Sequence, residues 1–334
     1  MTTDRKRVSR FWLYGPFALA GVILAGYYAL WRYAAGEMKS AVQDWAVEQE
    51  RVGLSVSYDK IKASGFPFFL RVHIDNPDLA TPDGWRWRTE KLAIDALPYA
   101  LDRLIFSPVG EQSISTPELG NWRFTAEDFR ASIAQDKTRG WIFSMTIRDA
   151  EASSRNDRRA MLKSLIYDVF PETTGSTTLT LSLDAADVYA SDGQHELSVN
   201  RAQTFLLLSE TAMLSQTDPL TAWRSAGGAL DIRGLGVNIN DAELSANGKV
   251  SLDSNNHPNG TLSLEVAKPL NIEKPLAATG AMTPEDAEAV AASLTLAAMA
   301  GGGKARGTLE FRDGTAFLNG VEVAALPTFS SRQE

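Results

Sequence analysis

An uncharged, mostly apolar run near the N-terminus constrains this chain more than any other feature. Residues 11–31 read FWLYGPFALAGVILAGYYALW and contain no charged side chain. A helix rises 1.5 Å per residue, so about 20 residues span the roughly 30 Å of hydrocarbon in a bilayer. The run therefore predicts a transmembrane helix over residues 11–33. Pro16 falls within its first turns, where a helix tolerates proline best.

The flanks of this run predict its orientation. Arg5, Lys6, Arg7 and Arg10 precede it, with only Asp4 against them. Basic residues next to a membrane helix stay on the cytoplasmic side. Residues 1–10 are therefore expected to form a cytoplasmic basic tail, and everything after the helix should lie on the other side. Aromatic residues at both ends are typical of interfacial belts, namely Trp12, Tyr14, Tyr27, Tyr28, Trp31 and Tyr33.

Two other interpretations of the run fit less well. A cleaved signal peptide has an apolar stretch of about 7–15 residues that ends in small side chains. Here the stretch is longer and ends in bulky Tyr, Leu and Trp. A buried core helix fits poorly with an apolar surface on every side and a basic cluster at one end. We expect an uncleaved membrane anchor.

Composition limits what the remainder can be. The chain has 334 residues, of which 44% are hydrophobic and 22% charged, so its bulk should fold. The formal charge of −8 argues against nucleic acid as the main partner, because phosphate binding needs a concentrated basic face. The absence of cysteine excludes disulfides, thiolate catalysis, iron–sulfur clusters and cysteine zinc sites.

Periodicity predicts a mainly β (α+β) protein after the membrane helix. Residues 34–52 are expected to form an amphipathic connecting helix, with Met38, Val42, Trp45 and Ala46 on one face. From residue 53 to 326 apolar residues recur with period two, which predicts a β-rich domain of mostly antiparallel strands, followed by a tail over 327–334. Clear examples are Leu54/Val56/Tyr58, Trp122/Phe124, Trp141/Phe143/Met145/Ile147, Leu179/Leu181/Leu183 and Leu262/Leu264/Val266.

Turns and helices are expected between these strands. Turn signals occur at Asn76-Pro77, Pro82-Asp83-Gly84, Asp192-Gly193, Asn247-Gly248, Asn259-Gly260 and Asp313-Gly314. Helical spacing predicts helices over residues 156–170 and 283–299, and a short one over 219–225. In the second of these Thr283 would be the N-cap, Pro284 the first helical residue and Gly301–Gly303 the stop.

The search for catalytic, cofactor and metal sites selects no residue. His73, His195 and His257 lie far apart without the spacing of a metal motif, so we interpret them as ordinary polar side chains. Gly301–Lys304 follows a predicted helix instead of preceding one, which does not suit a phosphate loop. Asp253–Asn256 lacks the glycine and distal glutamate of a calcium loop and is expected to be a turn.

The segment from Trp45 to Pro77 resembles the opening of a known family. It contains a tryptophan-bearing helix, a strand, Ser64-Gly65-Phe66-Pro67-Phe68 and a second strand. This arrangement resembles the domain-of-unknown-function family 2125 (DUF2125), proteins of Gram-negative bacteria with the same N-terminal anchor. Asn247–Asp253, Asn259–Leu264 and Phe311–Pro327 resemble that family's last strands, with Asn319-Gly320 where a second Gly-Pro is expected. The family has no assigned activity, so the resemblance carries over no catalytic residues.

A more distant similarity concerns the AsmA-type envelope proteins. The anchor, the strand–turn rhythm and the hairpin sequence over Leu244–Asp253 carry it. It implies an elongated, curved sheet that forms an apolar groove for lipid. The expected function is a non-enzymatic, inner-membrane-anchored periplasmic protein that binds or transfers lipid.

Two alternatives remain open. One is a scaffold that binds a protein partner of the envelope. The other is a carbohydrate-active enzyme, which needs two carboxylates in a cleft beside exposed tryptophans. The eight tryptophans favour core packing over such a site.

Overall fold

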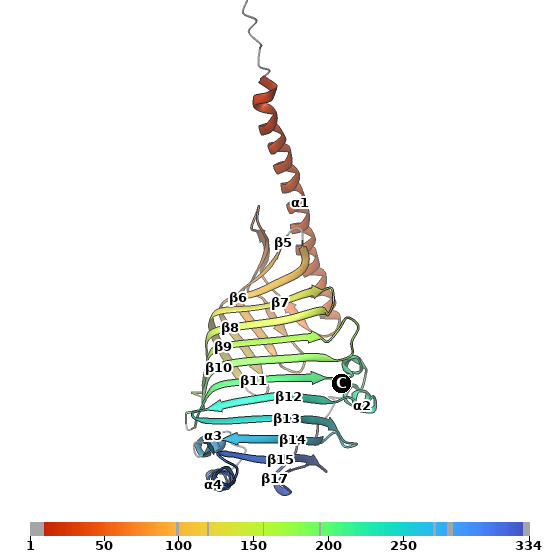
Figure 1. The fold of residues 1–334 in the computed structure, drawn as a ribbon. Coiled ribbons are helices and arrows are strands. Elements are labelled where there is room, and N and C mark those ends of the chain that lie inside the picture. The colour runs from red at the N-terminus through yellow and green to blue at the C-terminus, as the bar shows by residue number, and fades with distance from the viewer. Residues whose placement is uncertain are drawn as a thin grey trace, which may run out of the picture. The chain divides into compact units, whose positions relative to one another are not determined.

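The computed structural model describes residues 10–97, 100–118, 120–155, 157–193, 195–269, 272–278 and 283–329. The chain divides into two compact units, Met1–Val109 and Gly110–Glu334. The 17 described strands belong to one sheet, and their described pairings are antiparallel (Figure 1). The prediction of a mostly antiparallel β protein with an apolar N-terminal helix and few other helices is confirmed.

The first unit combines one long helix with short strands. Its elements are α1 (Arg10–Arg51), β1 (Ser55–Ser57), β2 (Lys60–Ser64), β3 (Leu70–Asp75), β4 (Asp78–Ala80) and β5 (Arg86–Leu97). Strand β3 lies between β2 and β5, and β4 lies between β1 and β5. Strand β6 (Ala100–Thr116) crosses the boundary between the units.

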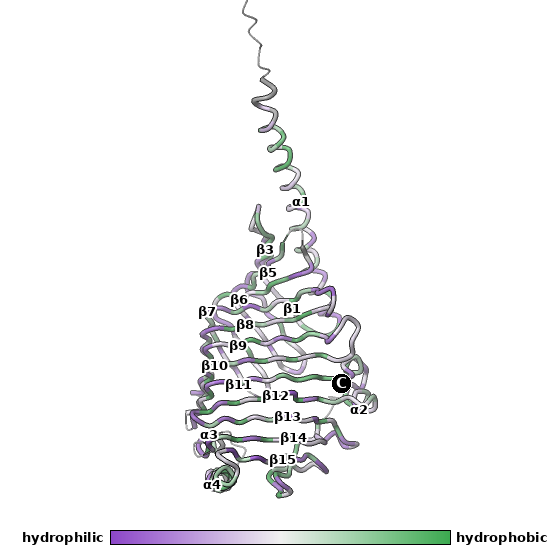
Figure 2. Tube along the Cα trace, viewed as in Figure 1, coloured by the Kyte–Doolittle hydropathy of each residue, from purple (hydrophilic) through white to green (hydrophobic). Residues whose placement is uncertain are grey.

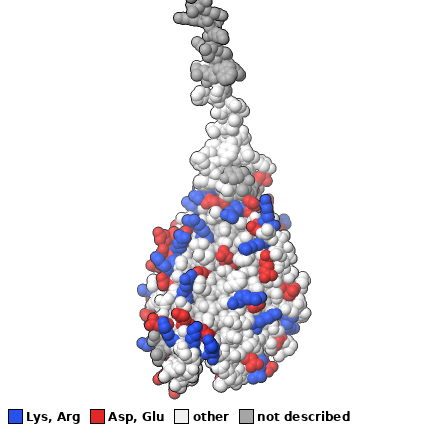
Figure 3. All heavy atoms as spheres, viewed as in Figure 1, with Lys and Arg blue, Asp and Glu red and all other residues white. Residues whose placement is uncertain are grey.

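Helix α1 joins the predicted membrane and connecting segments without a break. The part over Pro16–Arg51 is long and apolar enough to span a membrane by length and composition, and 11% of its apolar 18-residue window is buried inside the protein. Figure 2 shows the described apolar stretch in green, and Figure 3 shows no charged atoms along it. Exposed side chains include Phe17, Val22, Ile23 and Leu24. The outward-facing apolar surface suits contact with lipid more than a protein core.

The C-terminal half of α1 packs on β3. Trp31, Ala34 and Ala35 are buried against Leu70, which has no exposed surface. Met38 also contacts the cluster of Val72, Ile74 and Ile94. Trp31 therefore faces protein, although its position at the end of the apolar run suggested an interfacial belt. Trp45, which was expected on the packed face, is 46% exposed.

The second unit is a meander in which each described strand pairs with the next along the chain. Its strands are β7 (Gly120–Asp136), β8 (Gly140–Ser154), β9 (Arg159–Pro171), β10 (Leu179–Ser191), β11 (Glu196–Leu208), β12 (Leu230–Ile239), β13 (Ala242–Leu252), β14 (Pro258–Ala267), β15 (Lys304–Arg312), β16 (Thr315–Leu318) and β17 (Val321–Ala325).

The helix expected over residues 156–170 is wrong, because strand β9 occupies this segment from Arg159 onward, while residue 156 lies outside the described residues. Its apolar residues recur at helical spacing on both sides of Lys163, and this pattern favoured a helix. In the structure β9 pairs along its length with both β8 and β10. Two flanking strands satisfy its backbone hydrogen bonds, and this tertiary pairing overrides the local pattern.

The other two predicted helices are confirmed. Helix α2 (Pro219–Ser225) begins after Asp218, whose side chain accepts a hydrogen bond from the Thr221 N–H. Helix α4 (Pro284–Ala300) follows Thr283 and ends at the glycines over 301–303, where the Gly301 and Gly303 N–H groups bond to carbonyls of its last turn. Two short elements complete the unit, η1 (Thr211–Ser215) and α3 (Glu273–Ala278).

Two of the expected turns are wrong. Gly248 lies inside β13 and Gly260 inside β14, where turn residues were expected. Their φ angles are 150° and 153°. A Cβ on Gly248 would lie 2.1 Å from the Thr261 carbonyl oxygen, and a Cβ on Gly260 would lie 2.1 Å from that of Lys249. The glycines are needed for the close approach of two neighbouring strands, and the turn itself lies at residues 253–257.

Candidate functional site

The strongest candidate site is one face of the β7–β12 sheet, which we call the apolar face. Residues directly opposite each other on antiparallel strands point to the same side, so the register groups side chains into rows. Three rows cross six strands. They are Ile133–Phe143–Val169–Leu181–Leu206–Ile232, Ala131–Met145–Tyr167–Leu183–Thr204–Leu235 and Phe129–Ile147–Leu165–Ala185–Ala202–Val237.

Two further rows extend this face across β7–β11. They are Ala126–Ala150–Leu162–Val188–Val199 and Phe124–Ala152–Ala160–Ala190–Leu197. Among the members of all five rows, Thr204 carries the one polar group apart from the Tyr167 hydroxyl. The apolar face is therefore a continuous surface of aliphatic and aromatic side chains.

This surface is incompletely covered. Of its members only Ala185 and Ile232 are buried, at 7% and 9% exposed. The other members are half-buried, and Ile133 reaches 37% exposed. Since an ordinary sheet core buries its large side chains almost completely, this face retains accessible apolar surface.

Farther along the sheet a helix covers the corresponding positions. Val266 and Ala305 are 4% and 1% exposed, and they pack with Ala291 and Ala298 of α4. Val266 and Ala305 lie opposite each other and next to Leu244, so they continue the third row beyond Val237. The comparison indicates that α4 closes the third row at β14–β15, whereas its members on β7–β11 other than Ala185 remain partly accessible.

A line of polar residues explains how the face stays continuous. One residue in each of β7–β11 lies at this line and does not take part in the regular strand pairing. These residues lie opposite one another by register, namely Glu127, Asp149, Lys163, Asp187 and Asn200. In β7 the rings of Phe124 and Phe129 lie on either side of this line, and their centroids are 6.1 Å apart. Strict alternation would put residues five positions apart on opposite faces, so the alternation changes phase in β7. Asp149 and Asp187 adopt positive φ, which aspartate tolerates better than most residues. The nearest row members on the two sides of the line are three positions apart in each of the five strands, so we infer the same phase change in the other four strands and one shared apolar face.

The opposite face carries the charges. Figure 3 shows Lys and Arg interspersed with Asp and Glu over this face. Described ion pairs on it include Arg201–Asp184 at 2.7 Å and Lys304–Glu265 at 2.5 Å. Lys163 also pairs with Asp149, and this hydrogen bond lowers the pKa of Asp149 and raises that of Lys163. Exposed ion pairs of this kind contribute little to stability, so their main effect is to keep this face polar and hydrated.

Three cavities in the described parts of the chain have largely polar linings, and one of about 600 Å³ is lined by residues such as Asn247, Glu265 and Arg306. One of about 430 Å³ is lined mostly by charged side chains such as Asp59, Lys62 and Lys91. One of about 510 Å³ is lined by two acidic and two basic side chains and by three members of the fifth apolar row, namely Glu111, Glu151, Arg123, Arg159, Phe124, Ala152 and Ala160. Glu111 lies 3.9 Å from Arg123, so the two glutamates do not form an isolated acid–base pair. These cavities give little support to a glycosidase site.

The three histidines are not brought together. His73 lies in β3, His195 in the exposed turn before β11 and His257 before β14. Within the described residues no group of three or more His, Asp or Glu side chains could hold a metal ion. The prediction that these histidines are ordinary polar side chains remains a prediction.

His73 has an unusual environment. Its Nδ1 atom is buried without a hydrogen-bond partner. Burial lowers the pKa of His73, and the positive charges of Arg71 and Lys91 lower it further, while Asp95 and Asp75 oppose this effect. The folded protein therefore favours the neutral imidazole.

This environment predicts a pH-dependent stability. In the unfolded chain a histidine titrates near pH 6.5. Between that pH and the lower folded pKa, the unfolded state binds a proton that the folded state does not. Stability should therefore fall as the pH drops from about 7.5 to about 5.5, a window above the carboxylate pKa range. Urea unfolding of the full chain in detergent should show this fall, and His73→Gln should reduce it. An equal fall in both proteins would contradict the assignment.

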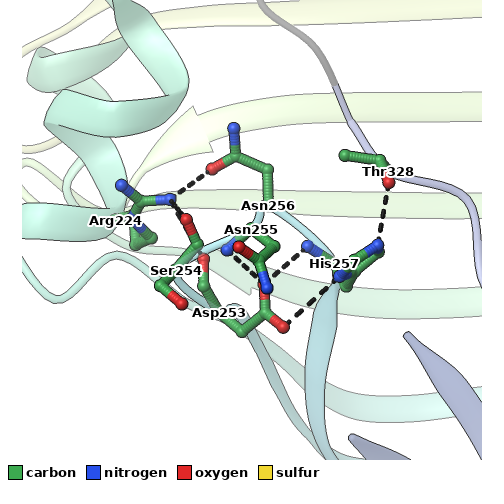
Figure 4. Close-up of polar contacts among 7 residues, drawn as sticks. All are labelled: Arg224, Asp253, Ser254, Asn255, Asn256, His257 and Thr328. Carbon is green, nitrogen blue, oxygen red and sulfur yellow. Dashed lines mark hydrogen bonds and ion pairs between the residues drawn. The ribbon is translucent and has the colours of Figure 1, made fainter. Parts of the chain in front are cut away.

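A polar cluster around the β13–β14 turn fixes the C-terminal segment (Figure 4). Asp253 Oδ1 accepts hydrogen bonds from the Asn255 and His257 N–H groups, both at 2.8 Å. Arg224 of α2 donates to the Asn256 side-chain oxygen at 2.6 Å and to the carbonyl oxygens of residues 253 and 254. The turn predicted over Asp253–Asn256 is thus confirmed, and sequence reasoning gave no sign of its distant partner Arg224.

The same cluster contains a Thr–His–Asp contact. Thr328 Oγ1 lies 2.8 Å from His257 Nε2, and His257 Nδ1 lies 3.4 Å from Asp253 Oδ2. The order resembles nucleophile, base and orienting acid, but 3.4 Å is too long for a His–Asp hydrogen bond, and His257 Nδ1 has no hydrogen-bond partner. None of the cavities described above includes these residues. The arrangement is best interpreted as a clamp that holds residues 328 and 329, since the Phe329 N–H also bonds to the Asn256 carbonyl.

Comparison with known proteins gives one match. The model of a family described as "Uncharacterized protein conserved in bacteria (DUF2125)" matches residues 31–327. No curated protein and no solved structure matches the chain.

Proposed function

Because this chain belongs to the bacterial DUF2125 family, we propose that it is a non-enzymatic, membrane-anchored envelope protein whose apolar face binds the acyl chains of a lipid or a lipidated ligand. The family match covers most of the chain and confirms the resemblance seen in its sequence motifs.

The observation that carries this proposal is the accessible apolar face. Its five rows lack charged side chains, and most of their members are half-buried. Acyl chains would bury the remaining surface at a gain of about 25 cal/mol per Å². A tether at the bilayer would keep such a face close to its ligand. The sequence resemblance to AsmA-type proteins is in keeping with this proposal.

The direct test is the identification of bound lipid. The full chain would be extracted in a mild detergent and examined by native mass spectrometry. Under the proposal the protein retains acyl-containing molecules in a defined ratio through gel filtration. A protein that carries only detergent, even after incubation with envelope lipids, would overturn it.

The proposal also places the bulk of the chain in the periplasm, with the N-terminus in the cytoplasm. The basic residues before the apolar run support this orientation. The chain has no cysteine, so Val52→Cys, at a position 71% exposed, would be uniquely reactive. A membrane-impermeant maleimide should label Val52→Cys in spheroplasts, whereas Thr3→Cys should react only after lysis. The reverse pattern would show the opposite orientation.

An envelope scaffold is the second candidate, and strand β17 favours it. All five residues of β17 are exposed, including Val321 and Val323 at 67% and 46%. An exposed strand offers backbone groups for pairing with a partner strand. Co-purification of a stoichiometric protein partner without lipid would support this function over lipid binding.

A further inference from the structure

A second apolar feature lies in the first unit, in the loop between β2 and β3. The loop reads Gly65-Phe66-Pro67-Phe68-Phe69, and we call it the aromatic loop. The Phe68 and Phe69 N–H groups both bond to the Gly65 carbonyl at 3.1 Å, which closes a tight turn. Three phenylalanines are thus displayed on a short, well-defined loop.

The aromatic loop is attached to α1 at one level of the helix. The Tyr27 hydroxyl donates to the Pro67 carbonyl at 2.5 Å, and Trp31 Nε1 donates to the Phe69 carbonyl at 3.0 Å. The Phe66 ring lies 5.2–5.9 Å from the rings of Tyr27, Tyr28 and Trp31. These contacts fix the loop beside the last turns of the apolar run.

Phe68 takes no part in these contacts. It is 79% exposed, more than any other large hydrophobic side chain of the described chain. Phe66 and Phe69 each remain 37% exposed even with their contacts to α1. Arg71 lies 5.1 Å from the centre of the Phe69 ring and is itself paired with Asp95 through two hydrogen bonds, so the exposed part of the loop is its aromatic tip. An exposed aromatic tip beside the aromatic end of an apolar helix is the arrangement that suits the membrane interface.

We propose that the aromatic loop inserts Phe68 into the membrane interface beside the end of the α1 span. This inference rests on the proposed membrane anchor and concerns a second, separate contact with the bilayer. Tyr27 to Trp31 end the apolar run, so a loop bonded to them lies at the level of the headgroups. Insertion would give the unit a second point of attachment and restrict its rotation about α1.

The absence of cysteine permits a site-specific test. Phe68→Cys, Leu24→Cys and Val52→Cys would each be made in the full chain, labelled with a small fluorophore and reconstituted in vesicles of phosphatidylethanolamine and phosphatidylglycerol. Leu24 lies within the span and is 62% exposed, and it reports on the anchor. Helix α1 continues to Arg51, so Val52 lies about 30 Å beyond Trp31 along the helix axis. Val52 is exposed and is the matched control for a position in water. Lipids with a nitroxide near the headgroup, and iodide in the water, would serve as quenchers.

We expect the nitroxide near the lipid headgroup to quench the fluorescence of the label at position 68. Iodide in the water should not quench it. The label at Val52 should show the opposite behaviour. If Leu24 contacts lipid but Phe68 is quenched by iodide as strongly as Val52, the loop proposal is wrong and the anchor stands. If Phe68 is shielded from both quenchers, the loop binds protein and the proposal fails. If Leu24 itself has no contact with lipid, both the anchor and the loop proposal are wrong.

Discussion

Gly248→Ala is expected to lower the free energy of unfolding by about 2–4 kcal/mol. The added Cβ would lie 2.1 Å from the Thr261 carbonyl oxygen and 2.9 Å from the Leu262 Cα. These are backbone atoms of a paired strand, so relief requires the ladder to open. A φ of 150° adds strain for any residue with a side chain. Gly260→Ala should behave alike, because its Cβ would meet the backbone of Lys249 and Val250.

Gly236→Ala provides the matched control for these substitutions. Gly236 lies in β12, and no atom lies within 4 Å of a Cβ placed on it. Its replacement should change stability by less than about 1 kcal/mol. The measurement is urea unfolding of each full-length protein in detergent, followed by tryptophan fluorescence. Equal midpoints for Gly248→Ala and Gly236→Ala would contradict the close approach of β13 and β14.

Met145→Glu is expected to remove most of the bound acyl ligand. Met145 lies in the middle of the apolar face, opposite Ala131 and Tyr167. A polar group without a partner in apolar surroundings costs at least about 2 kcal/mol. That cost lowers affinity about thirtyfold or more. The amount of lipid retained per protein, measured by mass spectrometry, should fall accordingly.

Thr146→Glu is the control for this experiment. Thr146 is the next residue of β8 and points to the opposite, charged face, where it lies across from Arg130. The same carboxylate should be tolerated there, and the lipid content should remain that of the unchanged protein. Both variants should keep the same urea midpoint within error. Leu183→Gln offers a milder change if Met145→Glu unfolds. Equal lipid retention by the folded Met145 and Thr146 variants would exclude the apolar face as the site.

The sequence correctly predicted the helices and strands that are set by the spacing of nearby apolar residues or by proline and glycine at their ends. The apolar run over residues 11–31 gave the helix α1, because its length and composition suffice for a span. Alternating residues such as Trp141, Phe143 and Met145 predicted β8 and the side of the sheet on which they lie. Pro284 and the glycines over 301–303 predicted the limits of α4 to within one residue of its C-terminal end.

Signals that depend on partners far along the chain were misleading. The apolar residues of the segment over residues 156–170 recur at helical spacing and predicted a helix. From Arg159 onward this segment forms β9, since β8 and β10 supply its hydrogen bonds. Asn247-Gly248 has the composition of a turn and yet lies within β13, where the glycine admits a neighbouring carbonyl. In both cases the deciding interaction comes from another strand.

The sequence by itself determined an apolar helix followed by strands with one apolar side, since both follow from the period and length of apolar runs. Only the tertiary structure decided how these parts combine. The register aligned the interruptions at Glu127, Asp149 and Lys163 into one line, with apolar rows on both sides of it. It also brought Pro67 and Phe69 to Tyr27 and Trp31, some 40 residues earlier in the chain. Such contacts depend on chain pairing across long separations, which no local window of sequence contains.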